Sequence, residues 1–561
     1  MTPKQVWVVP FFGQGHLLPS IELCKQIASR SFPTVLVIPS NFSSSVPSLL
    51  RQHLLVEIAE ISSSPADLRP PPPPPGSVPT HDPHHGHHNS MAMGLENLLL
   101  AQTTGPEGVR PVCAVVDIMM DWTAEIFRKF EVPTVAFFTS GACSAAMEYA
   151  CWKAHPIDVK PDEVHLLPGL PEEMGLTYSD TKQRPHGPPG PQQPNLGAGH
   201  PGPFRSSPPP GPPPPFHGPG TQRRGPPKPG GQPPWLEEVK GSIALMINTC
   251  DELERPFIEY LAGQIGKPVW GVGPLLPEQY WKSVGSIIHD HEIRSNRKSN
   301  VTEDEVIQWL DSKPHGSVLY VSFGSEVGPS IEECSQLADA LEESTRPFIW
   351  VIQPGSGRPG PPIPPAGSDS VEEGYFPHGL ENRVGRRGLI IQGWAPQLLI
   401  LSHPSTGGFL SHCGWNSTVE AIGRGVPFLV WPIRGDQHHD AKLVVAHLKV
   451  GYMVSNDLEK IKKEDIVQGI ERLMNDEEVK QRAIALAAKF ENGFPICSSS
   501  DMFSVSHDGS GSSLGTMADE SSMWETRTAP MSRSGNSFVV FACPKTHETS
   551  RSGQFRTSTN K

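Results

Sequence analysis

The sequence predicts an α/β protein built from two Rossmann-like units, each organised around a parallel β-sheet. In the first third of the 561 residues, short β-rich runs alternate with segments of helical periodicity, which is the pattern of βαβ units. The same alternation returns after residue 317, so a second unit of the same kind is expected. Between them, residues 272–300 show no clear period and form the predicted linker.

Each predicted element rests on its local pattern. In the first unit, at 1–271, apolar and β-branched runs predict strands, and helical spacing of apolar residues predicts two helices. The strands are expected at 6–12, 34–39, 112–117 and 134–138, and the helices at 20–30 and 121–130. In the second unit, at 301–492, strands are expected at 317–323, 348–352, 389–391, 408–411 and 427–431, and helices at 331–343 and 415–423.

The chain contains 63 Pro and 53 Gly, and this surplus is concentrated in a few segments. Of the 50 residues at 185–234, 20 are Pro and 11 are Gly, a composition that buries too little apolar surface to fold. We therefore predict a disordered insert there. The last segment, 493–561, is rich in Ser, Thr and Gly without sustained periodicity, and is predicted to be a disordered tail.

Charge and cysteine content narrow the function classes. There are 46 Lys and Arg against 59 Asp and Glu, for a formal charge of −13, which argues against nucleic acid or an anionic membrane as the main partner. The nine Cys form no CxxC pair, and no stretch reaches 18 apolar residues. These features predict a cytosolic protein with reduced thiols and no integral membrane segment.

A motif after the first predicted strand places a histidine at a helix N-terminus. In Gly13-Gln14-Gly15-His16, backbone amides are expected to face a ligand. A dinucleotide fingerprint would need a small residue where Leu18 stands, so no NAD site is predicted. The positive helix end disfavours the imidazolium form, which leaves His16 able to act as a general base. The alternative is a polar loop histidine.

A carboxylate is expected close to this histidine. Asp117 ends the apolar run 112–117, at the end of a parallel strand where such sheets form their ligand crevice. An Asp that accepts one imidazole N–H strengthens the other ring nitrogen as a base, so a His16–Asp117 pair is a catalytic hypothesis. The alternative is that Asp117 caps the next helix, although Asp121 is better placed for that.

Residues 394–437 hold the densest group of candidate ligand-binding residues. The strand at 408–411 runs into a helix start where His412, Asn416 and Ser417 gather, an arrangement that favours a diphosphate. The alternative is a capping box, with Ser417 and Glu420 merely starting the helix.

Two features at the ends of this segment suit a nucleotide sugar. Trp394 precedes a turn and could offer a flat face to a base, or could simply be packed. Asp436 and Gln437 follow a predicted strand and could exchange hydrogen bonds with sugar hydroxyls, or could lie in a surface turn.

This segment resembles the signature box of plant secondary-product UDP-sugar glycosyltransferases. It has the full 44-residue length of that box, from Trp394 to Gln437, with the Trp-Ala-Pro-Gln opening, the His-Cys-Gly-Trp-Asn-Ser core and the Asp-Gln close. The resemblance extends from about residue 6 to about residue 490. It includes Gly15-His16, Asp117, Phe137-Phe138-Thr139, Asn248-Thr249, Glu252-Leu253-Glu254 and Ser322-Phe323-Gly324-Ser325.

The resemblance implies a role for each matching position. It implies two facing Rossmann-like domains, the GT-B arrangement, with His16 as catalytic base and Asp117 as its partner. Around the uracil and ribose it implies Trp394, the Ala395 backbone, Gln397 and Glu420. Around the diphosphate it implies His412, Asn416, Ser417 and Ser325, and around the sugar Trp415, Asp436, Gln437 and Thr139.

The function that follows is inverting transfer of glucose from UDP-glucose to a hydroxyl of a hydrophobic small molecule such as a phenolic, flavonoid or terpenoid. The UDP-sugar is a co-substrate, and neither a cofactor nor a metal is expected, because a neutral amide network can replace a metal at the diphosphate. The alternatives are UDP-galactose or UDP-xylose as donor, or an inactive relic that still binds a UDP-sugar.

Overall fold

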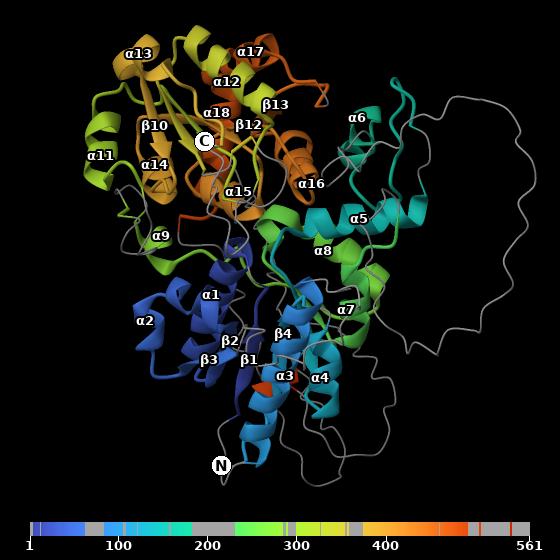
Figure 1. The fold of residues 1–561 in the computed structure, drawn as a ribbon. Helices are drawn as coiled ribbons and strands as arrows, with labels where there is room; N and C mark the ends of the chain where they lie inside the picture. Colours follow the sequence, from blue (N-terminus) through green and yellow to red (C-terminus); the bar gives the residue numbers. More distant parts are fainter. Residues whose placement is uncertain are drawn as a thin grey trace, which may run out of the picture.

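The computed structural model describes most of the two predicted units. The described residues are 4–11, 13–61, 83–104, 108–120, 122–155, 159–181, 231–283, 288–289, 299–325, 327–353, 356–357, 374–458, 460–491, 504–505 and 539–540. Two stacked α/β units make up the fold, one with a seven-stranded and one with a six-stranded sheet (Figure 1).

The first sheet is wholly parallel and has the strand order β3-β2-β1-β4-β5-β6-β7. Its strands are β1 (Val6–Val9), β2 (Thr34–Pro39), β3 (Val56–Ile61), β4 (Cys113–Asp117), β5 (Thr134–Phe138), β6 (Leu245–Ile247) and β7 (Val269–Gly271). The direction in which successive strands are added to the sheet reverses between β1 and β4. The connections that follow these two neighbouring strands therefore run to opposite sides. A crevice is expected at their carboxyl ends.

Helices cover both faces of this sheet. They are α1 (Gln14–Ser29), α2 (Ser48–Arg51), α3 (Pro83–Thr104), α4 (Thr123–Lys129), α5 (Ala142–Ala154), α7 (Trp235–Gly241) and α8 (Asp251–Ile265). Two short helices, α6 (Tyr178–Thr181) and α9 (Glu278–Lys282), contact the second unit instead, through Lys442 and Arg424. Core strands such as β4 and β5 are buried along their whole length because both faces are covered.

The second sheet is also parallel and repeats this topology, in the order β10-β9-β8-β11-β12-β13. Its strands are β8 (Val318–Ser322), β9 (Phe348–Ile352), β10 (Gly388–Gln392), β11 (Thr406–Ser411), β12 (Phe428–Val430) and β13 (Gly451–Met453). Here the order reverses between β8 and β11, which places a second crevice at their carboxyl ends.

The helices of the second unit are α11 (Glu303–Asp311), α12 (Ile331–Glu343), α13 (Leu380–Val384), α14 (Gln397–Ser402), α15 (Trp415–Ile422), α16 (Gln437–Lys442), α17 (Lys463–Asn475) and α18 (Glu477–Ala488). In Figure 1, α15 and α16 lie at the lower edge of this unit, facing α1 and α5 of the first. The carboxyl ends of both sheets therefore open toward the same interface.

The predicted fold class, two facing Rossmann-like units, is confirmed. Four predicted elements have the observed bounds, namely β2, β5, α12 and β9. Sequence reasoning missed β3, in which Glu57 and Glu60 interrupt the apolar pattern, and the three-residue strands β6, β7 and β13. Runs this short give no periodicity that distinguishes a strand from a loop.

The predicted insert and tail lie almost entirely outside the described residues. Of 185–234, the structure describes only 231–234, and α7 begins directly afterwards at Trp235. Within 493–561 it describes only β14 (Ser504–Val505), paired antiparallel with β15 (Val539–Val540). The disorder of both segments stays a prediction. Across the part of the chain that is described, no helix is long and apolar enough to span a membrane.

Candidate functional site

The predicted histidine–carboxylate pair forms at the crevice of the first sheet. His16 lies in the first turn of α1, directly after β1, and Asp117 ends the neighbouring strand β4. His16 Nδ1 is 2.8 Å from Asp117 Oδ2. The Asp117 side chain is fully buried, whereas 26% of the His16 side chain is exposed. Asp117 therefore contacts the buried edge of the imidazole ring, and the rest of the ring remains accessible at the interface.

Asp117 also serves the chain turn that follows it. Its Oδ1 accepts a hydrogen bond from the Met119 backbone N–H at 2.9 Å, so both carboxylate oxygens are engaged. The predicted helix cap at Asp121 lies outside the described residues, and α4 begins at Thr123 without a side-chain cap. Asp117 therefore does not cap α4, the alternative considered from the sequence; it binds the Met119 N–H and His16 instead.

A third side chain reaches the same imidazole nitrogen. Thr139 follows β5, and its Oγ1 is 2.9 Å from His16 Nδ1. Because the Asp117 carboxylate can only accept, Nδ1 carries the proton, and the Thr139 oxygen is a second acceptor for it. Nε2 is then the basic nitrogen of the neutral ring. The resemblance implied a sugar contact for Thr139, and its hydroxyl oxygen lies beside the base.

The crevice of the second sheet is formed by a tight turn between β11 and α15. In this turn Cys413 has a positive φ of 61°, and its N–H is held by the Ser411 hydroxyl at 3.0 Å. His412 packs against two glycines: a Cβ at Gly324 or at Gly414 would lie 2.7 or 2.5 Å from His412 Nε2. Only glycine at these two positions leaves room for the ring.

Burial fixes the protonation of His412. The residue is 8% exposed, and burial lowers its pKa to about 4, an effect that the Ser322 backbone offsets only in part. His412 is therefore neutral at pH 7 and presents an N–H dipole rather than a charge. Ser325 is exposed in the loop after β8, one residue beyond Gly324, so the structure brings it to the same crevice.

The alternative of a capping box at Ser417 is wrong. The helix α15 begins two residues earlier, after Gly414, and has no side-chain cap. Ser417 and Glu420 instead accept hydrogen bonds from Gln397 Nε2, at 3.0 and 2.7 Å. Tyr320 donates to Gln397 Oε1 at 3.1 Å, which fixes the orientation of the amide. These contacts join the start of α14 to α15.

The beginning of the signature segment lies beside this cluster. Trp394 is half-buried, Ala395 is 6% exposed, and the Gln397 N–H bonds to the Ala395 carbonyl at 2.8 Å. The Trp394–Gln397 segment is therefore fixed relative to α15.

A proline in α1 supplies one of the contacts between the units. Pro19 has no N–H, so the helix leaves the carbonyl of Gly15, four residues earlier, without its usual backbone donor. Asn416 Nδ2, from the first turn of α15, donates to this carbonyl at 3.1 Å. Gly15, the residue before His16, is thereby tied to the helix expected to bind the diphosphate.

The adjacent residue of α15 makes a second contact across the interface. Trp415 is 4% exposed, and its Nε1–H donates to the Asn248 carbonyl at 2.6 Å. Its ring lies so close to Gly141 that a Cβ there would be 2.7 Å from it. Because the indole ring is fully engaged in this packing, only the backbone of Trp415 could contact a sugar.

In the closing pair Asp436-Gln437, the Gln437 side chain is held by backbone groups of its own loop. Gln437 Oε1 accepts the N–H groups of Ile433 and Arg434, both at 3.0 Å. This orients the amide and leaves its NH2 group as the side available to a ligand. Asp436 is half-buried, and burial raises its pKa, against the opposing influence of Ser140 and His16.

Sequence reasoning missed two buried carboxyls behind this pair. Asp440, on α16, is 0% exposed, and its pKa is raised well above the ordinary value, mainly by burial and then by Asp436 and Glu254. Glu254, also 0% exposed, accepts from the N–H groups of Ala142 and Cys143 at 2.8 and 2.7 Å, and burial raises its pKa to about 7. The burial of neither was recognisable from the sequence, although the family resemblance included Glu254, because each is buried only by contacts between distant segments.

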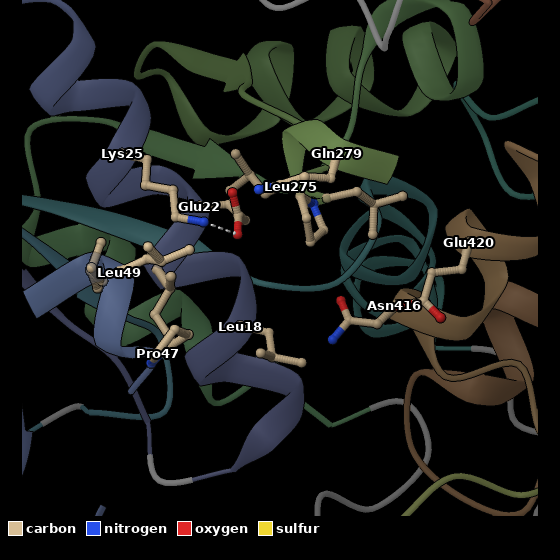
Figure 2. Close-up of a pocket in the computed structure, with 13 residues that line it drawn as sticks. Leu18, Glu22, Lys25, Pro47, Leu49, Leu275, Gln279, Asn416 and Glu420 are labelled. Carbon is tan, nitrogen blue, oxygen red and sulfur yellow. Dashed lines mark hydrogen bonds and ion pairs between the residues drawn. The ribbon is translucent and has the colours of Figure 1, made fainter. Parts of the chain in front are cut away.

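A cavity opens beside α15 at the junction of the two units. Figure 2 shows Asn416 and Glu420 on one side of it and Leu18, Glu22 and Lys25 of α1 on the other. Its empty volume is about 630 Å³, including the mouth, and most of its lining is apolar. Among the described residues no group of three or more His, Cys, Asp or Glu side chains could hold a metal ion.

Comparison with known proteins identifies the family. Residues 287–493 match the family model described as UDP-glucoronosyl and UDP-glucosyl transferase. The chain is 30% identical over 509 residues to UDP-glycosyltransferase 73C13 of Barbarea vulgaris, covering 86% of this chain and 91% of that protein. The chain belongs to the UDP-glycosyltransferase family. A second relative, scopoletin glucosyltransferase of Nicotiana tabacum, is 29% identical over 488 residues, with 84% and 89% coverage.

Solved structures agree with this assignment at the level of the fold. Glycyrrhiza uralensis UGT73P12, complexed with glycyrrhetinic acid 3-O-monoglucuronide, has a TM-score of 0.61 at 24% identity and covers 87% of this glycosyltransferase and 91% of its own chain. Phytolacca americana UGT2, with UDP-2fluoro-glucose and pterostilbene, has a TM-score of 0.58 at 23% identity, with 87% and 94% coverage. The chain is thus an enzyme that transfers glycosyl groups from a UDP-sugar to small molecules.

The glycosyltransferase brings the predicted site residues to one interface from both units. His16, Asp117 and Thr139 come from the first sheet, and the remaining predicted residues come from the loops and helix starts of the second. Asn248, which the family resemblance included without assigning it a role, lies at the centre of this interface. Its position directly after β6, at the same sheet edge as Asp117 and Thr139, was the available signal, but β6 itself was not predicted.

Proposed function

We propose that this enzyme transfers glucose from UDP-glucose, with inversion, to a hydroxyl of a hydrophobic small molecule such as a phenolic, flavonoid or terpenoid. The observation that carries the proposal is the contact of His16 Nδ1 with Asp117 Oδ2 at 2.8 Å. It leaves Nε2 as the acceptor of a proton on a ring that remains partly exposed at the interface.

The reaction requires only one proton transfer, from the acceptor hydroxyl to His16. His16 Nε2 takes the hydroxyl proton as the oxygen attacks the anomeric carbon of the sugar. The bond from that carbon to the UDP oxygen breaks on the opposite face, and the electron pair leaves with UDP. Asp117 stabilises the imidazolium that forms. Attack and departure on opposite faces invert the anomeric centre.

The donor is proposed to lie along the second unit. Trp394 and the Ala395 backbone would hold the uracil, and Gln397 and Glu420 the ribose. The diphosphate would be held by His412, Asn416, Ser417 and Ser325. These groups offer neutral N–H and O–H donors, and the N-terminus of α15 adds its backbone amides, so the charge of departing UDP is stabilised by oriented dipoles.

The sugar would lie between the units, in contact with Asp436, Gln437, the Trp415 backbone and Thr139. Support for glucose and for a phenolic acceptor comes from the tobacco relative, whose name describes a scopoletin glucosyltransferase. UDP-galactose or UDP-xylose as donor, and a relic without turnover, are the competing proposals. A cytosolic location, and activity without a cofactor, remain predictions from the sequence.

The proposal is tested by measuring UDP release from UDP-glucose with a panel of phenolic, flavonoid and terpenoid alcohols. We expect turnover with at least one acceptor class and a product of inverted anomeric configuration, identified by NMR. Binding of UDP-glucose without UDP release across the whole panel would support the relic instead.

Exchanging Gln437 for His is expected to shift the ratio of turnover with UDP-glucose and UDP-galactose toward galactose. The amide of Gln437 is held by the Ile433 and Arg434 N–H groups, so its NH2 faces the proposed sugar position in one orientation. A neutral imidazole offers only one N–H, in a ring of different shape, so it cannot reproduce the two N–H groups of the amide. The ratio is measured with both donors at matched concentrations, and an unchanged ratio would mean that the sugar is recognised elsewhere.

A further inference from the structure

The contacts of Thr139 link the base to the rest of the interface. Its Oγ1 lies 2.9 Å from His16 Nδ1, and its side chain cannot move freely because the residue is 7% exposed. The hydroxyl and the Asp117 carboxylate are two acceptors for one N–H, which confines the imidazole plane more strictly than a single acceptor would.

Asn248 holds Thr139 in this place. Its Nδ2 donates to the Thr139 carbonyl at 3.1 Å, and its backbone N–H donates to the Phe138 carbonyl at 2.9 Å. Two successive carbonyls at the end of β5 are therefore bound by one residue. Asn248 is 1% exposed, so these bonds are shielded from water.

The remaining two polar groups of Asn248 reach outside the first sheet. Its Oδ1 accepts the Leu275 N–H at 2.7 Å, on the segment that leads toward the second unit. Its carbonyl accepts the Trp415 Nε1–H at 2.6 Å, from the first residue of α15. Gly273 gives the side chain room, since a Cβ there would lie 2.3 Å from Asn248 Oδ1.

We propose that Thr139 is a positioning residue for the base His16, and that Asn248 anchors it to α15, the helix that binds the donor. The chain of bonds runs from α15 through Trp415, Asn248 and Thr139 to the imidazole. The base is therefore oriented for attack only when the two units are docked. This inference rests on the proposed function, because it assumes that His16 is the base.

The test compares two variants of Thr139 that differ in one group. Thr139→Val keeps the shape but removes the second acceptor, and kcat is expected to fall about tenfold, the scale on which misaligning a catalytic group acts. The acid limb of the rate–pH profile should move to lower pH, because the imidazolium loses an acceptor. Thr139→Ser keeps the hydroxyl and should restore both. Thr134→Val, which removes a buried hydroxyl at the other end of β5, is the matched control.

Asn248 is tested by a double-mutant cycle. Asn248→Ala should lower kcat by a similar factor while the Kd for UDP stays within about twofold, and combining it with Thr139→Val should cost no more than the slower single variant. If Asn248→Ala folds poorly by thermal unfolding, Asn248→Asp, which retains the acceptor for Leu275, replaces it. Multiplicative effects in the cycle would overturn the anchoring role.

Two further outcomes separate this inference from the proposed function. If Thr139→Val keeps the wild-type rate and pH profile while His16→Ala is inactive, the positioning role is wrong and the base assignment stands. If His16→Ala itself keeps the wild-type rate, the proposed function fails first. A fall in kcat for Thr139→Val with an unchanged pH profile would reduce Thr139 to a sugar contact.

Discussion

Replacing His16 by Ala is expected to lower the rate of glycosyl transfer by about 10²-fold or more, because a general base typically contributes 10²- to 10⁴-fold. The Kd for UDP should stay within a few-fold, since His16 lies on α1 and the proposed nucleotide contacts come from the second unit. The measurement is initial-rate UDP release at saturating UDP-glucose and acceptor, with UDP binding followed by calorimetry.

Two companion variants make this result specific. Asp117→Asn should be milder than His16→Ala, because the ring and its Thr139 contact remain. His315→Ala removes an exposed histidine at a turn before β8 and should leave transfer unchanged. Near-wild-type turnover in His16→Ala would show that the acceptor proton leaves by another route.

Replacing Asp440 by Asn is expected to change how stability depends on pH. Burial raises the pKa of this carboxyl well above its ordinary value in the folded protein, while in the unfolded chain it ionises above pH of about 4. The folded state thus binds one proton more, and stability falls as pH rises, by up to about 1.4 kcal/mol per pH unit. An amide has no such dependence. The stability of Asp440→Asn relative to the wild type should therefore increase steadily between pH 5 and pH 8.

Thermal unfolding across this pH range measures the effect. For a unit of about 200 residues, 1 kcal/mol corresponds to roughly 2–4 °C in Tm, so the gap between the two proteins should widen by several degrees toward pH 8. Asp162→Asn, at an exposed site, should show a constant difference from the wild type. A constant difference for Asp440→Asn as well would mean that Asp440 is ionised in the folded enzyme.

The sequence was informative where a function depends on the end of a strand or the start of a helix. The apolar run before Asp117 and the glycines before His16 predicted both positions at one sheet edge, and the parallel topology brings them within hydrogen-bond distance. Likewise, His412 and Asn416 were predicted at a helix N-terminus, and α15 begins there. Local chain geometry determines such placements.

The residues that escaped prediction depend on contacts between distant segments. The Ser417 and Glu420 pattern suggested a capping box, but Gln397, 20 residues earlier than Ser417, takes both acceptors. The burial of Asp440 and the bond from Trp415 to the Asn248 carbonyl arise only when the two units meet. The other three bonds of Asn248 join it to residues far away in the sequence, at 138, 139 and 275. No local pattern encodes such partners, because their spacing along the chain has no fixed relation to their distance in space.

The proline in α1 has a consequence for release of the product. When the units separate, the bond from Asn416 to the Gly15 carbonyl breaks. In an ordinary helix the backbone N–H four residues later would already bind that carbonyl. Because Pro19 has no N–H, the Gly15 carbonyl can exchange the Asn416 amide for water without breaking a backbone bond of α1. The net cost of exchanging this one bond for a bond to water is about 1 kcal/mol, so it adds little to the cost of separating the units. The backbone of the helix that carries His16 is therefore the same whether this bond is formed or broken.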